Sequence, residues 1–336
     1  GTWAGSARMT RPGLLVIYTE GGRARGLGHV SRCSAYARYR QAQGGRVLWM
    51  LDGDDLATSM IADCGEVRIG PWQDESAALP DLNPAVAIVD SYRVSAAVVA
   101  AIADQAATPV FIDDLQRLRY SRGLVVHPAL DPAPLRPDGA EWLTGPLWQP
   151  LRPAFWSVAL RGPVRPVVER ILVTLGGSDV HDLGAAIIRQ VAHAFPGAHI
   201  DWVTGDGSAP PAPGVTAHRR LSDQAMAALM LEADLAVSAA GSTTFELARC
   251  GVPTVLLGVA GNQQPNLDHW PDLCGFVDAG RSDAADRSAR IQAGLDSLRD
   301  PRVRAVISDR AQATVDGQGV RRLFDRLQVP TRKAAS

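Results

Sequence analysis

The apolar positions of the chain fall into short continuous runs separated by longer amphipathic segments. Such runs, apolar at every position, are typical of parallel strands covered on both faces. The strands predicted in the first half are Leu14–Tyr18, Arg46–Leu51, Val86–Asp90, Val110–Ile112 and Leu124–Val126. Helices are predicted between them at His29–Gln43 and Ser95–Ala106. The alternation predicts a parallel α/β architecture.

A second series of the same kind follows a proline-rich stretch, Pro128–Pro166, which favours an extended linker. Its predicted strands are Ile171–Leu175, Ile200–Thr204, Leu235–Ser238, Thr254–Leu257 and Phe276–Val277. Its predicted helices are Asp182–Ala194, Ser222–Glu232, Thr243–Cys250 and Ala284–Leu298. We therefore expect two doubly wound domains of similar size, with the boundary near residues 150–165. Ligands of such folds bind at the carboxyl ends of the strands.

Composition narrows the class of protein. The 336 residues are 46% hydrophobic and 21% charged, with a formal net charge of -1. Without a basic excess, nucleic-acid binding is not expected, and without a run of about 18 apolar residues no membrane span is expected. The four cysteines, at positions 33, 64, 250 and 274, have no zinc-site spacing. They are predicted to be free thiols in a reducing cytoplasm.

The loop after the first predicted strand is a candidate catalytic site. It reads Gly-Leu-Gly-His-Val-Ser-Arg-Cys over positions 26–33. Glycines permit a close approach of ligand to backbone, which makes Gly28 a candidate nucleotide contact. His29 would stand near the start of the next helix, whose dipole disfavours the imidazolium and keeps a neutral base available. The alternative is a histidine that only caps or packs the helix, but the flanking glycines favour catalysis.

A glycine pair follows the first predicted strand of the second half. Gly176, Gly177 and Ser178 lead toward a helix, where exposed backbone N–H groups suit an anion such as a diphosphate. No Gly-Lys-Ser/Thr follows, so this is not a Walker loop. Gly-Gly also forms plain turns, which is the alternative.

A further loop combines a glycine with hydroxyls. Gly241, Ser242, Thr243 and Thr244 precede a predicted helix, and these residues suit a phosphate. Glu246 lies about one turn into that helix, where a carboxylate can accept both ribose hydroxyls. Thr243 and Glu246 also fit a capping box, and both roles are compatible.

Amide side chains are concentrated in the loop 261–266, which includes Asn262 and Gln263. Amides both donate and accept hydrogen bonds, so they suit sugar hydroxyls and N-acetyl groups. The alternative is a polar loop that only begins the next helix.

Two acidic motifs end predicted strands in the first half. Asp90 begins Asp-Ser-Tyr, and Asp113 and Asp114 are adjacent. The aspartate pair has no accompanying His or Glu cluster, so no metal is predicted. Asp90 and Asp113 either anchor loops or contact substrate, and the sequence leaves both possibilities open.

Taken together and in this order, the motifs resemble the hydrolase family of pseudaminic acid biosynthesis, which acts on UDP-2,4-diacetamido-2,4,6-trideoxy-altropyranose, and related spore-coat polysaccharide proteins. The resemblance runs from about Leu14 to Leu327, and the second half also resembles the lipid II N-acetylglucosaminyltransferase. The matching segments are 26–33, 90–93, 112–115, 176–179, 239–246, 262–263 and 316–322.

The resemblance implies a GT-B fold, in which two Rossmann-like doubly wound domains face each other across a cleft. It implies an N-terminal domain over 9–155, a nucleotide-sugar-binding domain over 165–317 and a C-terminal helix, 318–328, that packs back on the first domain. His29 would be the catalytic residue, Tyr92 and Asn262 would help at the sugar, and Glu246 would hold the ribose of UDP. Tyr18 and Glu20 replace the Arg-x-Asp common in the family, so the sugar or the acceptor is expected to differ.

The function expected from the sequence is inverting, metal-independent hydrolysis of a UDP-activated amino sugar in the cytoplasm, with no cofactor. Neutral His29 would deprotonate a water while backbone amides stabilise the departing diphosphate. Glu20, Tyr92, Asn262 and Gln263 would contact the sugar. The alternatives are a GT-B glycosyltransferase that uses the same donor, and a nucleotide-sugar-binding protein without catalytic activity.

Overall fold

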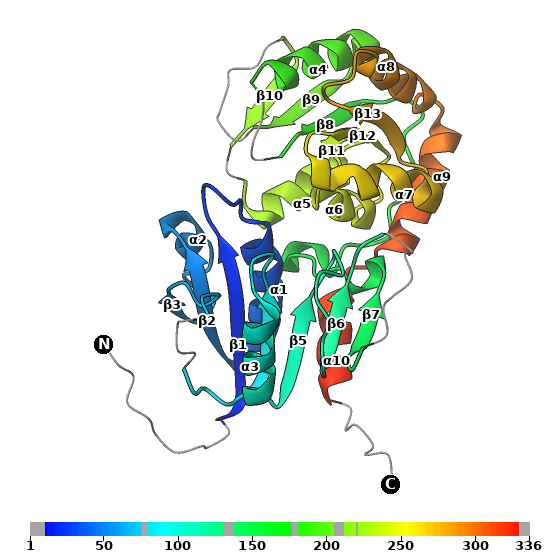
Figure 1. Ribbon diagram of the computed structural model, residues 1–336. Helices are drawn as coiled ribbons and strands as arrows, with labels where there is room; N and C mark the ends of the chain where they lie inside the picture. The colour runs from blue at the N-terminus through cyan, green and yellow to red at the C-terminus, as the bar shows by residue number, and fades with distance from the viewer. Residues whose placement is uncertain are drawn as a thin grey trace. The chain divides into compact units, whose positions relative to one another are not determined.

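Strand β1 (Arg11–Gly21) lies in the middle of a seven-stranded parallel sheet with the order β3-β2-β1-β4-β5-β6-β7 (Figure 1). The computed structural model describes residues 11–75, 80–130, 138–176, 181–204, 212–219 and 221–328. The other strands of this sheet are β2 (Arg46–Gly53), β3 (Glu66–Ile69), β4 (Pro84–Asp90), β5 (Thr108–Ile112), β6 (Leu124–His127) and β7 (Glu141–Thr144). The helices that accompany it are α1 (Gly28–Ala42), α2 (Asp55–Met60), α3 (Ala96–Gln105), the 3-10 turn η1 (Pro146–Trp148) and α10 (Gly319–Gln328).

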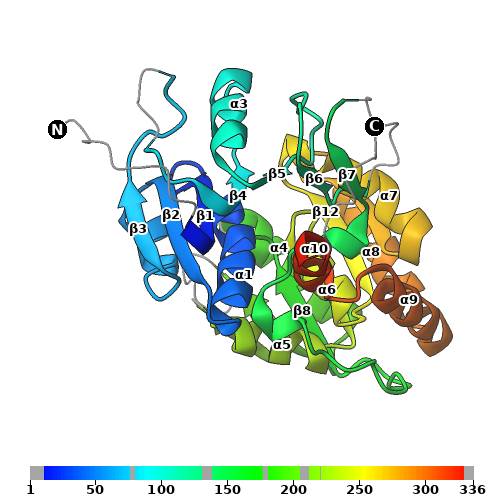
Figure 2. The same cartoon turned by 90° about the horizontal axis from the view of Figure 1, so that it is seen from below.

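Helices cover both faces of this sheet. Figure 2 shows α1 and α10 on one face and α3 on the other. Successive side chains of a strand point to opposite faces, and in β1 they pack into the layers on both sides. Val16 and Tyr18 belong to the cluster that includes Val98 and Ile102 of α3. The continuous apolar run of β1 is therefore explained by burial on two faces.

A second parallel sheet, with six strands in the order β10-β9-β8-β11-β12-β13, is built within the segment Ala154–Gly317. Its strands are β8 (Arg170–Thr174), β9 (His199–Val203), β10 (Val215–His218), β11 (Leu235–Ala239), β12 (Thr254–Gly258) and β13 (Val277–Arg281). The accompanying helices are α4 (His181–Ala194), α5 (Asp223–Glu232), α6 (Thr243–Arg249), the 3-10 turn η3 (Gly261–Gln263), α7 (Gln264–Cys274), α8 (Arg287–Ser297) and α9 (Pro301–Thr314). A further 3-10 turn, η2 (Pro153–Phe155), precedes them. The two-domain α/β prediction is thus confirmed at the level of the sheets.

The chain divides into two compact units that are not both continuous in sequence. The first consists of the residues up to Pro153 and those from Gln318 onward, and the second is Ala154–Gly317. Helix α10 belongs to the first unit, where Phe324 stacks on Tyr39 of α1 with ring centroids 4.9 Å apart. Arg326 of α10 also pairs with Glu141 of β7.

The proline-rich stretch Pro128–Pro166 is more structured than the sequence predicted. Its described part contains β7, η1 and η2, so its interpretation as one extended linker is wrong. β7 is only four residues long and is the edge strand beside β6. So short an edge strand gives no periodic signal that a sequence could reveal.

Several helices begin at residues whose side chains accept the first free backbone N–H groups. Asp54 accepts from Leu56 and Ala57 at the start of α2, and Ser95 accepts from Val98 at the start of α3. Such caps typically contribute about 1 kcal/mol each. They fix where each helix starts relative to the strand before it, and thus the loops between.

All four cysteines are buried and form no disulfide. No helix in the described part of the chain is long and apolar enough to cross a membrane.

Candidate functional site

His29 and Asp90 form a hydrogen-bonded pair at the carboxyl edge of the first sheet. Asp90 is the last residue of β4, and His29 is the second residue of α1, which follows β1. Nδ1 of His29 lies 2.7 Å from Oδ1 of Asp90. The histidine side chain is 14% exposed and the carboxylate is fully buried. A carboxylate only accepts hydrogen bonds, so Nδ1 donates, and in the neutral imidazole Nε2 is the nitrogen that can accept a proton.

Arg32, one turn further along α1, binds the same carboxylate. Its Nε and Nη2 donate to Oδ2 and Oδ1 of Asp90 at 2.5 and 2.6 Å, and its Nη1 donates to Asp114 at 2.8 Å. Burial raises the pKa of Asp90, but Arg32 and His29 lower it by more, so the pKa lies well below its ordinary value. Asp90 is therefore a permanent negative charge directed at His29.

Tyr92 lies against the imidazole. Its ring meets that of His29 edge to face, with centroids 4.4 Å apart, and its hydroxyl donates to both carboxylate oxygens of Asp114 at 3.0 and 3.1 Å. Burial and the negative charge of Asp114 raise the pKa of the Tyr92 hydroxyl well above its ordinary value. The tyrosine therefore stays protonated, and it is 40% exposed.

Glu20 is buried beneath the loop that carries Tyr92. It is 3% exposed, and its Oε1 accepts from Ser91 Oγ at 2.8 Å and from the Tyr92 N–H at 2.9 Å. Its Oε2 accepts from Gln73 at 3.0 Å, with Arg93 3.8 Å away. Because these contacts hold both oxygens, Glu20 positions the loop that carries Tyr92, and its direct contact with a sugar stays a prediction.

Asp113 proves to be a loop anchor. Its carboxylate accepts from the N–H groups of Leu115, Arg117 and Leu118 and from the hydroxyl of Tyr120. Of the two aspartates whose role the sequence left open, Asp90 therefore binds the histidine and Asp113 does not. Asp113 holds the segment after β5 in place.

In the second unit, the loops after β11 and β12 lie against each other. The side chain of Gln263 accepts from the Val259 N–H at 2.9 Å, and a Cβ placed on Gly241 would be 3.4 Å from its Nε2. Asn266 Nδ2 donates to the Ala240 carbonyl at 2.8 Å. The hydroxyl loop and the amide loop, distant in sequence, thus form one surface because β11 and β12 are neighbours.

Within the hydroxyl loop, the residues differ in what they can offer a ligand. Ser242 is exposed and Thr243 is partly buried, and no side-chain cap bond is present at the start of α6. Thr244 is fully buried, donates to the Gly241 carbonyl at 2.7 Å and accepts from Trp270 Nε1 at 2.9 Å. Its hydroxyl both donates and accepts within the protein, and the nucleotide contact of Thr244 stays a prediction.

The remaining predicted residues follow the carboxyl ends of strands in the two sheets. Gly28 is exposed at the first turn of α1, Asn262 is exposed in η3, and Glu246 of α6 is 8% exposed. Gly176 adopts a positive φ of 89° just after β8, a conformation that favours glycine. Gly177 and Ser178 lie outside the described residues.

Arg32 and Asp114 were not predicted as site residues from the sequence, and the role of Asp90 was left open. Asp90 was visible as a polar residue ending an apolar run, but nothing in the sequence showed which neighbouring strand it would face. Arg32 lies within the motif at 26–33, three positions after His29, a spacing that puts two side chains on one helix face. In the described part of the chain no group of three or more His, Cys, Asp or Glu side chains is arranged to hold a metal ion.

Solved structures share this architecture over nearly the whole chain. The calicheamicin glycosyltransferase CalG4 has a TM-score of 0.63 at 16% identity, covering 96% of this chain and 99% of that one. MurG of Acinetobacter baumannii has a TM-score of 0.61 at 15% identity, covering 94% and 99%. UGT89C1 of Arabidopsis thaliana, solved with UDP, has a TM-score of 0.64 at 10% identity, covering 95% and 100%. No protein-family model and no curated protein matches the sequence. The chain therefore has the GT-B fold, and the narrower hydrolase family stays a prediction.

Proposed function

We propose that this GT-B protein is an inverting glycosyltransferase that uses a nucleotide-sugar donor, with His29 as the general base. The observation that carries the proposal is the 2.7 Å contact between His29 Nδ1 and the buried Asp90 carboxylate. A base held by a carboxylate through one ring nitrogen presents the other nitrogen in a fixed orientation. In the described residues no group forms a hydrogen bond with Nε2.

In the proposed reaction an acceptor hydroxyl attacks the anomeric carbon of the sugar. The new C–O bond forms on one face of the ring while the bond to the diphosphate breaks on the other, so the configuration inverts. The bonding electrons leave with the diphosphate, and His29 Nε2 takes the acceptor proton. Asp90, whose pKa is held low, stabilises the resulting imidazolium. General-base assistance of this kind contributes about 10² to 10⁴ in rate.

The second unit would hold the nucleotide. The surface formed by the loops after β11 and β12 offers the exposed hydroxyl of Ser242 and the amide of Asn262. The carboxylate of Glu246, on α6, is buried except for 8% of the residue's surface. Hydroxyls and backbone N–H groups suit a diphosphate, and a carboxylate suits ribose. UDP is the nucleotide that we propose, because the motifs resemble UDP-sugar enzymes and UGT89C1 was solved with UDP and with UDP-L-rhamnose.

Hydrolysis of the same donor is the second candidate, and one observation favours it. The groups around His29 are polar or charged, namely Arg32, Tyr92 and Asp114. Such surroundings suit water as the acceptor. The fold of the solved structures, two of them described as glycosyltransferases, favours transfer.

One experiment separates the candidates. The protein is incubated in ¹⁸O water with UDP-2,4-diacetamido-2,4,6-trideoxy-altropyranose and with a panel of other UDP-sugars, and the products are followed by mass spectrometry. Transfer predicts little UDP release without an acceptor and a strong increase when acceptor alcohols or saccharides are added. Labelled free sugar with unlabelled UDP, formed without an acceptor, would instead establish hydrolysis. Tight UDP-sugar binding without turnover under any condition would leave only a binding protein.

A further inference from the structure

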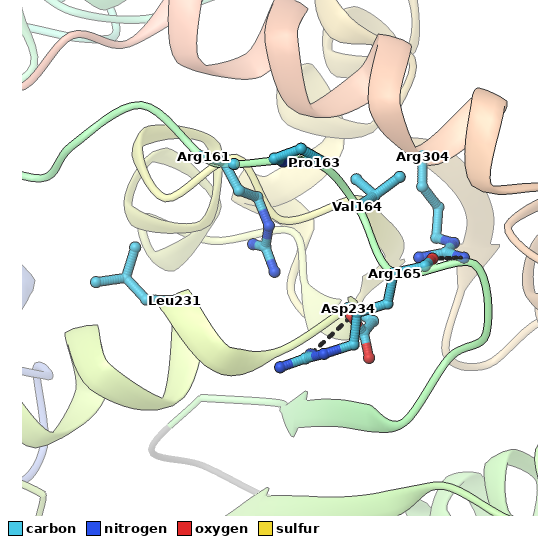
Figure 3. Close-up of a pocket in the computed structure, with 8 residues that line it drawn as sticks. Arg161, Pro163, Val164, Arg165, Leu231, Asp234 and Arg304 are labelled. Carbon is cyan, nitrogen blue, oxygen red and sulfur yellow. Dashed lines mark hydrogen bonds and ion pairs between the residues drawn. The ribbon is translucent and has the colours of Figure 1, made fainter.

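A cavity of about 190 Å³ lies in the second unit and is lined by three arginines (Figure 3). Arg161, Arg165 and Arg304 border it together with Asp234, and Pro163, Val164 and Leu231 supply apolar walls. Asp234 directly precedes β11, so the cavity lies at the amino ends of the strands. The loops after β11 and β12, which we propose to hold the nucleotide, lie at the carboxyl ends of the strands of the same sheet.

Arg304 has unused hydrogen-bonding capacity. Its side chain, on α9, is fully buried, and only its Nη2 donates, to the carbonyls of Arg165 at 2.8 Å and Pro166 at 3.2 Å. Its Nε and Nη1 are buried and have no partner in the described structure. Buried polar atoms without a partner are rare and indicate a bound ion or water. Burial also lowers the pKa of this guanidinium.

Arg161 and Arg165, the other two arginines of the lining, differ in the groups to which they donate hydrogen bonds. Arg161 donates to the backbone carbonyls of Ala233, Cys250 and Gly251, and Figure 3 shows its guanidinium directed into the space beside Leu231 and Asp234. Carbonyls satisfy its N–H groups but carry no full charge. Arg165 donates to Asp234 at 2.9 Å.

The charges of this lining do not balance. Asp234 neutralises Arg165, while Arg161 and Arg304 are left without a carboxylate in hydrogen-bond contact. Asp300, the other acid near Arg304, is bound by the side chain and N–H of Arg302. Two positive charges beside apolar walls favour a doubly charged anion, and guanidinium groups match the geometry of phosphate oxygens. Since a water molecule accounts for about 30 Å³ of the liquid, the cavity has room for a small oxyanion.

We propose that this cavity is a binding site for a phosphate-type dianion, held by Arg304 and Arg161 at the amino edge of the second sheet. It is separate from the surface that we propose for the nucleotide. The anion would accept from Nη1 of Arg304 and from the guanidinium of Arg161, and it would supply the missing negative charge. Because Arg304 belongs to α9 and Arg161 to the segment before β8, an anion bound to both would also join these elements.

The test is calorimetric titration of the full chain with inorganic phosphate at constant ionic strength, with chloride as the reference ion. We expect one phosphate per chain and a rise in Tm. Arg304→Met is expected to weaken binding at least tenfold and to cancel the rise in Tm. Leu231→Trp, which fills the cavity from an exposed position of α5 without removing an arginine, is expected to do the same.

Two controls locate the ion. Arg302→Gln removes an exposed arginine of the same helix, and Ser242→Ala alters the carboxyl-edge loop. Both are expected to bind phosphate like the wild type. Loss of binding in Ser242→Ala but not in Arg304→Met would place the ion at the other edge and overturn the proposal, as would the absence of phosphate binding by the wild type at millimolar concentrations. If Arg304→Met does not fold, Leu231→Trp decides.

A parallel titration with glucose 1-phosphate distinguishes a free ion from the phosphate group of a metabolite. Tighter binding of the ester, lost in the same two variants, would assign the site to a sugar phosphate. Tighter binding of inorganic phosphate would assign it to the free ion. None of these measurements depends on turnover, so the failure of the proposed glycosyl transfer and the failure of this site are separately visible.

Discussion

Nδ1 of His29 lies 2.7 Å from Oδ1 of Asp90, although 61 positions separate the two residues. The contact arises because β4 is the neighbour of β1, and α1 starts just after β1. The end of β4 therefore lies under the first turn of α1. The pairing fixes which nitrogen of the imidazole carries the proton, and with it the position of the other nitrogen.

Removal of the imidazole tests the proposed base. His29→Ala is expected to lower the kcat of nucleotide release from the donor by about 10² to 10⁴, with a modest fall in Tm because buried Asp90 keeps its two bonds from Arg32 but loses the one from His29. UDP release and circular dichroism melting provide the two readouts. His193→Ala, at an exposed position of α4, is the matched control. Activity of His29→Ala within threefold of the wild type would remove His29 from the mechanism.

Asp90→Asn tests the orienting role. The substitution keeps the shape of the side chain but removes the negative charge beside the imidazolium and offers an N–H to Nδ1, which favours the wrong tautomer. We expect kcat to fall by about 10² or more while KM for the donor changes little, because Asp90 is buried beneath His29. Steady-state kinetics of both variants and the double variant give the check. If the two losses multiply in the double variant, His29 and Asp90 act independently and not as a pair.

The contacts of Glu20 predict a stability effect. Glu20→Gln places an amide N–H₂ where Oε1 or Oε2 now accepts from buried donors, so one donor is left without a partner. The expected loss in the free energy of unfolding is about 1 to 3 kcal/mol, measured by urea denaturation. Glu66→Gln, at an exposed position of β3, should change it by less than about 0.5 kcal/mol. Equal effects of the two variants would mean that Glu20 does not hold the Tyr92 loop.

The low pKa of Asp90 predicts how stability depends on pH. In the unfolded chain an aspartate has a pKa of about 3.9, and in the folded chain the pKa of Asp90 is well below it. The ionised carboxylate thus contributes stability that is complete above about pH 4 and is lost as pH falls toward the folded pKa. The difference in free energy of unfolding between wild type and Asp90→Asn should therefore shrink below pH 4. Asp283→Asn, at an exposed site, is the control for the loss of one aspartate.

The sheets could be read from the sequence because burial on both faces leaves a local signal. Runs such as 14–18 and 235–237 are continuous in apolar residues, and each lies within a strand of the structure. The edge strands β3, β7 and β10 gave no such signal, because one side of an edge strand is free of neighbours and its residues are mostly half-buried or exposed.

The candidate site was predictable only in part. His29 stood out because it follows a strand within a glycine-containing motif, whereas the role of Asp90 depends on β4 lying next to β1. The partners of Glu20 and Thr244 could not be predicted: both residues stand at strand or loop ends where ligand contacts are common, but their polar atoms bind residues distant in sequence, Ser91 and Trp270. A sequence shows which groups are polar and not which are already satisfied.

Helix α10 has a consequence for biosynthesis. The ribosome completes the whole second unit before it releases the ten residues of α10, and at about 5 to 20 residues per second this interval lasts roughly ten seconds or more. Until then Tyr39 lacks the aromatic ring of Phe324, and the face of α1 that α10 covers stays open. The nascent first unit is thus incomplete through most of translation, and a fragment that stops at Pro153 would share that defect permanently.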